Sequence, residues 1–277
     1  MPLDAQDATR LLKWLIEAGA DEALAEEPID RYAAAKIAPV ARDEAATERR
    51  IPEPTRVYAA PLPLRPAAIQ PITPGAASAR EIAAACDSLD ALRAALERFD
   101  GCALKTTAKS LVFAAGPADA PVMLIGEGPG RDEDIEGLPF VGRSGQLLDR
   151  MLEAIGLSRE RNAYITNVIF WRPPGNRPPT AEEVAICAPF LLRHIELKAP
   201  KVIVLLGATP LKHVLNVEDG ITRARGRWGR YVTGGGIEVP ALPTFHPAYL
   251  LRTPSAKRQV WQDLLNLKLK LREMGVK

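Results

Sequence analysis

The chain has 277 residues, of which 47% are hydrophobic and 25% are charged, and its formal net charge is +2. A chain of this length can bury a full core, and its average charged fraction excludes wholesale disorder. No apolar run approaches the roughly 20 residues of a membrane span, the start carries no apolar signal segment, and three cysteines are too few for a disulfide framework. We therefore expect a cytoplasmic protein.

The beginning of the chain differs in composition from the rest. Apolar residues at helical spacing predict a helix over residues 8–24, and residues 51–75 contain seven of the 25 prolines, which favours an extended linker. We therefore divide the chain into an acidic helical extension at 1–50, a proline-rich linker at 51–77 and a main domain at 78–277.

Charge is unevenly distributed between these parts. Residues 1–75 have a net charge of −3, the remainder has +5, and residues 239–277 alone also have +5. Charge alone favours a solvated C-terminal helix, because Lys and Arg stabilise helix C-termini, over a surface that faces phosphates.

The main domain alternates helical and strand patterns. The helical patterns cover residues 78–98, 145–155, 180–197, 208–215 and 255–274. The apolar runs that predict strands cover residues 121–125, 163–170, 201–207 and 239–245. Apolar strands separated by helices predict an α/β fold with a parallel sheet covered on both faces, in which ligands bind beyond the carboxyl ends of the strands.

A glycine-rich segment, GEGPG at residues 126–130, directly follows the first predicted strand. Its glycines allow the backbone to approach a ligand, but their spacing matches neither a dinucleotide fingerprint nor a P-loop. Acidic side chains crowd this turn at Glu127, Asp132, Glu133, Asp134 and Glu136. These side chains either belong to a solvated loop, or the one at the strand end is a carboxylate that activates water or stabilises a cation.

Other candidate residues lie in a loop, at a helix start, inside a predicted strand and at a strand end. Phe140 is either a core residue or a stacking platform, and Ser144 is either a helix N-cap or, with Arg143, a phosphate ligand. Asn167 is either a satisfied core amide or a reader of a base edge that carries both donor and acceptor. His246 ends the last strand, where a lone histidine is more often structural.

Four segments taken together resemble the family 4 uracil-DNA glycosylases. They are GEGPGRDED…LPFVGRSGQLLDRML, NVIFWRPPGNRPPT, VIVLLGATP and FHPAYLLR, in the order of the family and over residues 99–270. The resemblance implies a three-layer α/β/α sandwich with a short central parallel sheet. It also implies a monofunctional enzyme of base-excision repair that flips deoxyuridine out of DNA, hydrolyses its N-glycosidic bond and leaves an abasic site.

The resemblance further implies roles for individual residues. Glu127 would stabilise the oxocarbenium ion and activate water, Glu133 and Asp134 on a looser loop are alternative acids, and His246 would hold the uracil anion. The uracil pocket would be lined by Gly126, Gly128, Phe140 and Asn167. DNA would be contacted by Arg143, Ser144, Tyr249, Leu250 and Arg252, with Leu250 as the wedge that fills the vacated space. With these motifs, the C-terminal positive charge is interpreted as a DNA-facing edge. The implied repair function also predicts association with the nucleoid if the source is bacterial, and it leaves open a contact of the acidic N-terminal extension with other repair or replication proteins.

The chain departs from the family at its metal site. Family 4 proteins usually carry a four-iron cluster on four cysteines, and the corresponding positions here are Phe99, Cys102, Trp171 and Cys187. Because two thiolate ligands are missing and Cys86 supplies only one more cysteine, we expect no 4Fe–4S cluster and no metal. We expect Cys102 and Cys187 to be buried near one another, with the aromatic rings where the cluster would lie.

Uracil-DNA glycosylase is therefore the expected function. A DNA-lesion binding module that retains uracil or the abasic product with little turnover is the alternative, and a nucleotide-binding protein unrelated to DNA is a third. The sequence leaves open the preference for single strands or mispairs and the activity on other damaged bases.

Overall fold

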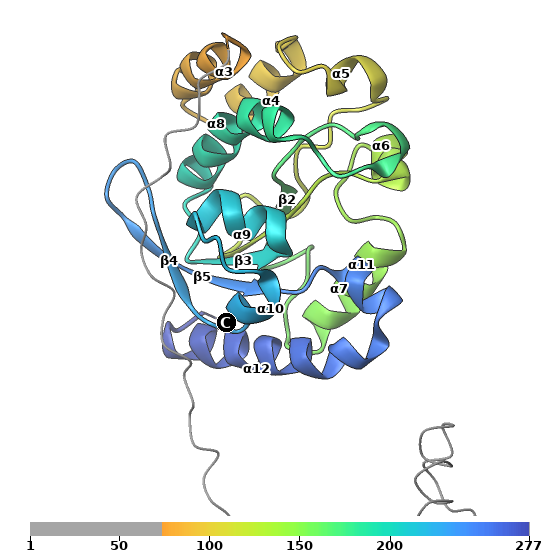
Figure 1. Ribbon diagram of the computed structural model, residues 1–277. Coiled ribbons are helices and arrows are strands. Elements are labelled where there is room, and N and C mark those ends of the chain that lie inside the picture. Colours follow the sequence, from red (N-terminus) through yellow and green to blue (C-terminus); the bar gives the residue numbers. More distant parts are fainter. Residues whose placement is uncertain (1–73, 277) are drawn as a thin grey trace, which may run out of the picture. The chain divides into compact units, whose positions relative to one another are not determined.

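A computed structural model describes residues 74–276 of the chain (Figure 1). The expected helix at 8–24, the acidic extension and most of the proline-rich linker lie outside the described residues. The helices are α3 (Pro74–Ala84), α4 (Leu89–Arg98), α5 (Leu104–Thr107), α6 (Arg131–Glu136), α7 (Arg143–Glu153), α8 (Ala181–Lys198), α9 (Ala208–Leu215), α10 (Ile221–Ala224), α11 (Pro247–Arg252) and α12 (Lys257–Glu273), with 3-10 turns η1 (Pro174–Asn176) and η2 (Pro254–Ala256). The strands are β1 (Val122–Gly126), β2 (Ala163–Asn167), β3 (Val202–Leu206), β4 (Gly229–Val232) and β5 (Glu238–Thr244).

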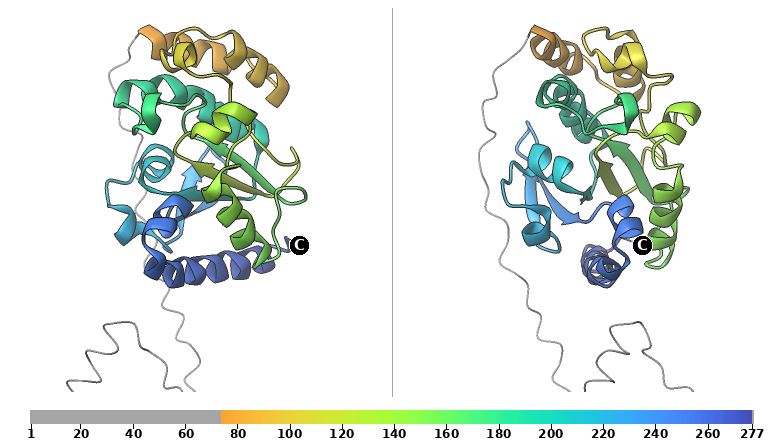
Figure 2. Two further views of the ribbon diagram at one scale, coloured as in Figure 1. Left: turned by 90° about the vertical axis from the view of Figure 1, so that its right-hand side faces the viewer. Right: turned by 45° about the vertical axis from the view of Figure 1, so that its right-hand side comes forward.

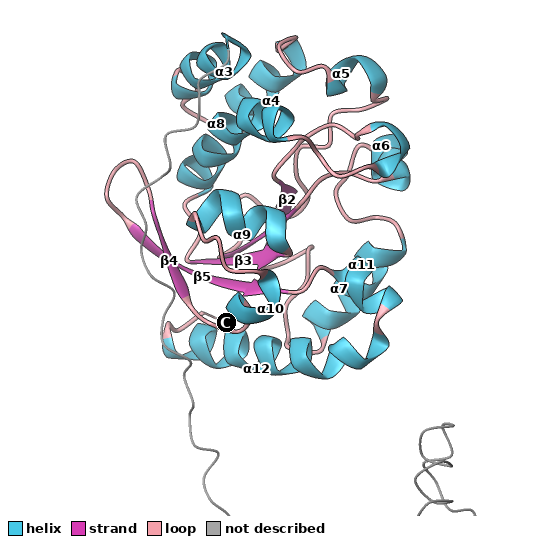
Figure 3. Ribbon diagram, in the orientation of Figure 1, coloured by secondary structure: helices cyan, strands magenta, loops and turns pink. Residues whose placement is uncertain are grey.

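These strands form one sheet in the order β2-β1-β3-β5-β4 (Figure 3). Strand β1 pairs in parallel with β2 and β3, and β3 pairs in parallel with β5. The register places Gly126 opposite Asn167 and Leu206 opposite Thr244, so the carboxyl ends of the parallel strands meet at one edge. The predicted parallel sheet is therefore confirmed, and ligands are expected at this edge.

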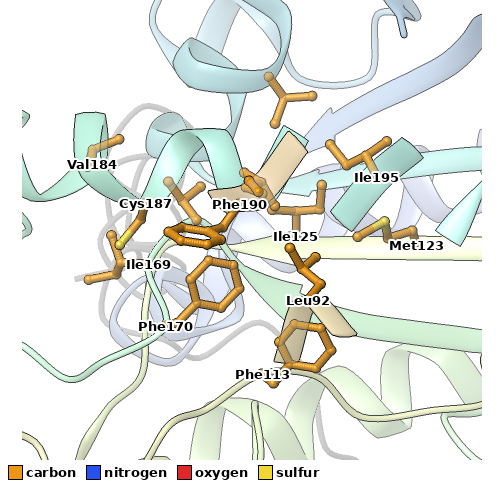
Figure 4. Packing of buried hydrophobic residues seen from close by; sticks show 14 of the residues in the cluster. Leu92, Phe113, Met123, Ile125, Ile169, Phe170, Val184, Cys187, Phe190 and Ile195 are labelled. Atoms are coloured by element: carbon orange, nitrogen blue, oxygen red, sulfur yellow. The ribbon is translucent and has the colours of Figure 1, made fainter. Parts of the chain in front are cut away.

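Side chains of each strand alternate between two hydrophobic cores. Met123 and Ile125 of β1 face a cluster built with α3, α4, α8 and α9, part of which is shown in Figure 4. Val122 and Leu124 face the other cluster, built with α7 and α12. Helices therefore cover both faces of the sheet (Figures 1 and 2), which confirms the expected three-layer sandwich. Each fully buried aliphatic side chain contributes about 1.5–3 kcal/mol to this packing.

The last strand of the sheet was not anticipated from the sequence. Strand β4 pairs with β5 in the antiparallel direction, so the sheet is mixed at this edge. Its four residues alternate between buried and exposed, with Arg230 and Val232 facing solvent. An edge strand this short and half polar lacks the apolar run that marks the central strands.

Two predicted boundaries were wrong. The helix expected over residues 78–98 is two helices, because the Ser88 hydroxyl accepts a hydrogen bond from the Ala91 N–H at 3.2 Å and starts α4 anew. Helix α3 already begins at Pro74, inside the expected linker, since proline is compatible with the first turn of a helix. No helix in residues 74–276 is long and apolar enough to cross a bilayer.

The strand expected over residues 163–170 ends at Asn167. Beyond it, the Val168 N–H donates to the Gly126 carbonyl at 2.9 Å and the Ile169 N–H donates to the Glu127 carbonyl at 3.2 Å. The buried apolar run therefore continues as irregular chain alongside the glycine-rich loop. Both segments line a cavity.

Candidate active site

A cavity of about 190 Å³ lies at the carboxyl edge of the sheet. It is smaller than the roughly 300–1,000 Å³ of drug-sized sites, which suits a single small ligand. Its lining comes from loops after the parallel strands and from two helix starts: Glu127, Gly128, Pro129, Gly130, Glu133, Phe140, Ser144, Asn167, Ile169, Pro173, Asn176, Arg177, Pro179, His246 and Ala248. The structure thus brings together most of the residues singled out in the sequence.

Asn167 ends β2 and is 1% exposed. Its side-chain oxygen and nitrogen both lack a hydrogen-bond partner within the described part of the chain. An unpaired buried polar group costs about 1–3 kcal/mol, so a folded protein retains one where a ligand completes it. The interpretation of Asn167 as a satisfied core amide is therefore wrong, and its amide is available to a ligand that has both a donor and an acceptor.

Gly126 must be a glycine because of these neighbours. A Cβ atom at this position would lie 2.5 Å from Asn167 Oδ1 and 2.5 Å from the Phe140 ring. Gly128 is similarly restricted, since its Cβ would lie 2.5 Å from Ile169 Cγ1. Both glycines therefore let the backbone pass close to the pocket wall.

Phe140 is buried and has a left-handed backbone with φ of 55°. Such a conformation is strained for an aromatic residue. It is stabilised by Arg159, whose guanidinium donates to the Pro139 carbonyl at 3.0 Å and to the Phe140 carbonyl at 2.7 Å. The ring centroid lies 5.4 Å from that of His246. Phe140 is therefore a fixed aromatic wall of the cavity.

Glu127 follows β1 and lines the cavity. Its Oε2 accepts a hydrogen bond from the hydroxyl of Thr209 at 2.5 Å. Thr209 belongs to the first turn of α9, after β3. Sequence reasoning missed this residue, although its place after the third parallel strand was a signal that could have identified it.

Glu133 and Asp134 lie in helix α6, and the expectation that they lie on a looser loop was wrong. The two residues are 8% and 6% exposed, because each carboxylate is turned inward to accept backbone hydrogen bonds. Glu133 accepts from the N–H groups of Gly130, Val141 and Gly142 at 3.0–3.1 Å. Asp134 accepts from two backbone N–H groups of the segment between α5 and β1, at 2.8 and 3.1 Å. These two carboxylates are engaged in holding the pocket loops together. Glu127 is therefore better placed than either of them to act on a ligand in the cavity.

His246 is the N-cap of α11 and lines the cavity. Its Nδ1 accepts a hydrogen bond from the Ala248 N–H at 3.1 Å. Burial, and to a smaller extent the charge of Arg252, lowers the pKa of His246 to about 4. The imidazole is therefore neutral at physiological pH, with its proton on Nε2 as a hydrogen-bond donor.

The residues expected to face DNA are only partly placed as predicted. Arg143, Tyr249 and Arg252 are exposed, and Ser144 lines the cavity at the start of α7. Gly142, not Ser144, is the N-cap of α7. The candidate DNA surface therefore lies beside the cavity, along the start of α7 and the length of α11.

Leu250 is not placed as a wedge. Its side chain is 1% exposed and packs in the core between the sheet, α7 and α12. A wedge has to be accessible before it enters a duplex, so the assignment of Leu250 was wrong. The neighbouring Leu251 is 40% exposed and takes its place as the candidate.

One wall of the cavity was not predicted. It is formed by the segment after β2, which contributes Ile169, Pro173, Asn176, Arg177 and Pro179. The Arg177 guanidinium donates to Glu183 at 2.6 and 2.9 Å, and Glu183 in turn completes the capping box of α8. The motif RPPGNRPPT follows a parallel strand, which was the available signal for this wall.

The four positions that correspond to cluster ligands are all buried. Cys102 and Cys187 are hydrogen-bonded to each other, and this bond together with burial raises the pKa of the Cys187 thiol. The expected closeness of the two thiols is therefore confirmed. The Phe99 ring packs against Phe190 with centroids 5.1 Å apart, and Trp171 lies against Phe170 at 6.4 Å.

This arrangement does not fit an iron–sulfur cluster. Figure 4 shows Cys187 beside the rings of Phe170 and Phe190, within an apolar core. A cubane cluster needs four thiolates, and two of the four corners here are aromatic side chains. Among residues 74–276, no group of three or more His, Cys, Asp or Glu side chains is arranged to hold a metal ion.

Comparison with known proteins places the site in a family. The model of the uracil DNA glycosylase superfamily matches residues 113–266. A type-4 uracil-DNA glycosylase of Thermotoga maritima is 42% identical over 65% of this chain and 93% of the relative. A type-4 uracil-DNA glycosylase of Archaeoglobus fulgidus is 38% identical over 64% of this chain and 90% of the relative. A type-5 uracil-DNA glycosylase of Pyrobaculum aerophilum is 34% identical over 49% of this chain and 64% of the relative.

Proposed function

The chain belongs to the uracil DNA glycosylase superfamily, and from this premise we propose that it releases uracil from DNA and leaves an abasic site. The observation that carries the proposal is the unpaired, buried amide of Asn167 in a small cavity beside Phe140. Such an amide matches the edge of uracil, where the N3–H donor lies next to a carbonyl acceptor. The Asn167 oxygen accepts from N3–H, and its NH₂ group donates to O4.

Because the Asn167 amide is buried, the uracil base has to leave the DNA helix to reach it. A base stacked in a duplex cannot reach the buried amide, so the nucleotide is flipped into the cavity, where Phe140 stacks on the ring. Flipping costs unstacking free energy, which contacts with the DNA backbone offset. The exposed Arg143 and Arg252 beside the cavity supply positive charge for these contacts.

The reaction breaks the bond between C1′ of the sugar and N1 of uracil. The bonding electron pair leaves with uracil, so positive charge develops on the sugar and negative charge on O2. The Glu127 carboxylate stabilises the sugar cation and orients a water molecule, while His246 Nε2–H donates to O2. Water adds to C1′ and gives the abasic sugar, and the proton lost by water passes through Glu127 to solvent. The released uracil anion takes up a proton from solvent.

We further propose that this enzyme works without an iron–sulfur cluster. The support comes from the two aromatic side chains at ligand positions, Phe99 and Trp171, which are 5% and 2% exposed. The chemistry assigned to Glu127, Asn167 and His246 requires no metal. In this proposal, aromatic packing replaces the structural role that a cluster has elsewhere in the family.

The experiment is a release assay on matched oligonucleotides. One carries a single uracil and the other carries thymine at the same place, and free base is measured by chromatography. We expect uracil release from the first, no thymine release from the second, and loss of uracil release in Asn167→Ala. Retention of wild-type release in this variant would contradict the assignment of the amide. Absence of release by the wild-type chain would contradict the proposed function.

A further inference from the structure

The parallel strands converge on the cavity, and three of their four carboxyl ends carry a residue with an assigned role. Asn167 ends β2, Glu127 follows β1, and His246 follows β5. Strand β3 lies between β1 and β5, and the turn after it leads to Thr209 in the first turn of α9. The strand order therefore places the turn that leads to Thr209 between the turns that carry Glu127 and His246.

The hydroxyl of Thr209 contacts one oxygen of the pocket acid. Thr209 Oγ1 donates to Glu127 Oε2 at 2.5 Å, across 82 residues of sequence. The direction follows from chemistry, because an ionised carboxylate only accepts. A hydrogen bond to a charged group is among the stronger ones in proteins. One of the two carboxylate oxygens is therefore already occupied before substrate binds.

The element that carries Thr209 is rigidly anchored. Leu211, Val214 and Leu215 of α9 are buried in the core. Gly207, which precedes the helix, has φ of 104°, and its N–H donates to the Thr244 carbonyl of β5 at 2.9 Å. The hydroxyl is thus presented from a fixed turn.

The acid, in contrast, lies on a segment with little side-chain packing of its own. Glu127 is flanked by Gly126 and Gly128, and its side chain is only partly buried. Without an external contact, the carboxylate would sample several rotamers. A group that must orient water and face a developing cation loses rate when its position is not fixed.

We infer that Thr209 is the positioning residue for Glu127: it fixes the carboxylate rotamer through Oε2 and leaves Oε1 to meet the water and the sugar cation. This inference rests on the proposed function, since it concerns the same reaction. It goes beyond the resemblance, which assigns no role to the turn after β3. A purely structural latch between α9 and the glycine-rich loop is the competing explanation.

The test compares three substitutions in the full chain. Thr209→Val is close in shape but lacks the hydroxyl, Thr209→Ser keeps it, and Thr222→Val is the control at an exposed threonine of α10. Three quantities are measured: the single-turnover rate of uracil release, the Kd for DNA with a tetrahydrofuran abasic analogue, and the Tm. The rate reports positioning, while the other two report folding and docking.

We expect Thr209→Val to release uracil about 10- to 100-fold more slowly, the range for loss of a hydrogen bond to a charged group. Its Kd for abasic DNA should change by less than about twofold, because a positioning role leaves docking intact. Thr209→Ser should stay within about threefold of wild type, and Thr222→Val should match wild type. In a Glu127→Ala background, Thr209→Val should have no further effect, since the group it positions is gone.

Several results would overturn the inference. They are a wild-type rate in Thr209→Val, an equal loss in Thr209→Ser, a rate loss matched by weaker DNA binding, or an additive loss in the Glu127→Ala background. A wild-type chain that releases no uracil, or a Glu127→Ala variant as fast as wild type, would overturn the proposed chemistry together with it. An active wild type, an impaired Glu127→Ala and a normal Thr209→Val would overturn only the role of Thr209.

Discussion

The backbone N–H of Ala248 donates to Nδ1 of His246 at 3.1 Å, and this hydrogen bond fixes the imidazole at the N-terminus of α11. Because Nδ1 is an acceptor here, the proton of the neutral ring lies on Nε2. Burial lowers the pKa of His246 to about 4, so this neutral donor persists across the physiological pH range. The protein thus offers uracil O2 a hydrogen bond without a formal positive charge.

The first prediction follows from this neutral donor. Substitution His246→Ala should lower the single-turnover rate of uracil release about 10²- to 10³-fold, as expected for loss of one donor to a developing oxyanion. Between pH 5.5 and 8, the wild-type rate should show no step that is absent from His246→Ala, because the imidazole protonates only near pH 4. Rates measured across this range check both points. A step near pH 6.5 that disappears in the variant would contradict the account.

The second prediction concerns the acid at the strand end. Glu127→Gln keeps the size of the side chain but removes its charge, and should lower the release rate at least about 10²-fold. Glu136→Gln is the matched control, because Glu136 is exposed on α6 and does not line the cavity. Single-turnover rates of the two variants should therefore differ strongly. Equal rates would remove Glu127 from the reaction.

The third prediction separates two neighbouring leucines. Leu250→Ala removes a buried side chain and should lower the free energy of unfolding by about 2–5 kcal/mol. Leu251→Ala removes an exposed one, so its Tm should stay close to wild type. If Leu251 is the wedge, this variant should lose more activity on double-stranded than on single-stranded uracil DNA. Thermal melts and paired release assays test the assignment, and equal losses on the two substrates would refute it.

The fourth prediction concerns acid stability. His194 is fully buried, its Nε2 is paired with the Tyr164 hydroxyl at 2.8 Å, and its ring stacks on Phe113 with centroids 4.3 Å apart. Burial, and secondly the charge of Lys198, lowers the pKa of His194 to about 3. Since the unfolded chain binds the proton below about pH 6.5 and the folded chain does not, this residue contributes stability above that pH that is lost on acidification.

The slope of this loss is the measurable quantity. Between about pH 6 and 4, one such histidine lowers the free energy of unfolding by about 1.4 kcal/mol per pH unit. His194→Phe keeps an aromatic ring that does not titrate, so its stability should fall less steeply over this range. Urea unfolding at a series of pH values gives both slopes. Identical slopes in the two proteins would show that His194 is not the titrating group.

The fifth prediction concerns the missing ligands. Protein purified without oxygen should contain well under one iron per chain and lack absorbance near 400 nm, because Phe99 and Trp171 supply no thiolate. It should still release uracil. Metal analysis and spectroscopy on the same active preparation check this. Stoichiometric iron and sulfide would contradict the proposal that the enzyme has no cluster.

Much of the fold could be predicted from the sequence, because central parallel strands are continuous apolar runs. The segments around Val122 and Val202 have this pattern, and both are inner strands of the sheet. The edge strand β4 could not be recognised, because half of its side chains face solvent and its pairing depends on β5. The break between α3 and α4 was also not predicted, since a single serine cap within an alanine-rich segment gives a weak local signal.

Most of the candidate site could be predicted for a similar reason. Glu127 and His246 directly follow apolar runs, Asn167 lies within one, and the resemblance to family 4 supplied their roles. Parallel strands bring the ends of such runs to one edge of the sheet. Thr209 was missed although its place after β3 was an available signal. Leu250 could not be assigned correctly, because the direction of a side chain on a short helix depends on how that helix packs. Helix α11 turns Leu250 into the core and leaves Leu251 outside, a choice that motif spacing does not contain.

The central claim is tested most directly by counting turnovers. A labelled oligonucleotide with one uracil is supplied in about hundredfold excess over the full chain, and free uracil per chain is followed with time. We predict release well beyond one uracil per chain, loss of this release in Glu127→Gln, and normal release in Glu136→Gln. A burst that stops at one uracil per chain, with the DNA retained, would instead identify a lesion-binding module, and no release would contradict the account entirely.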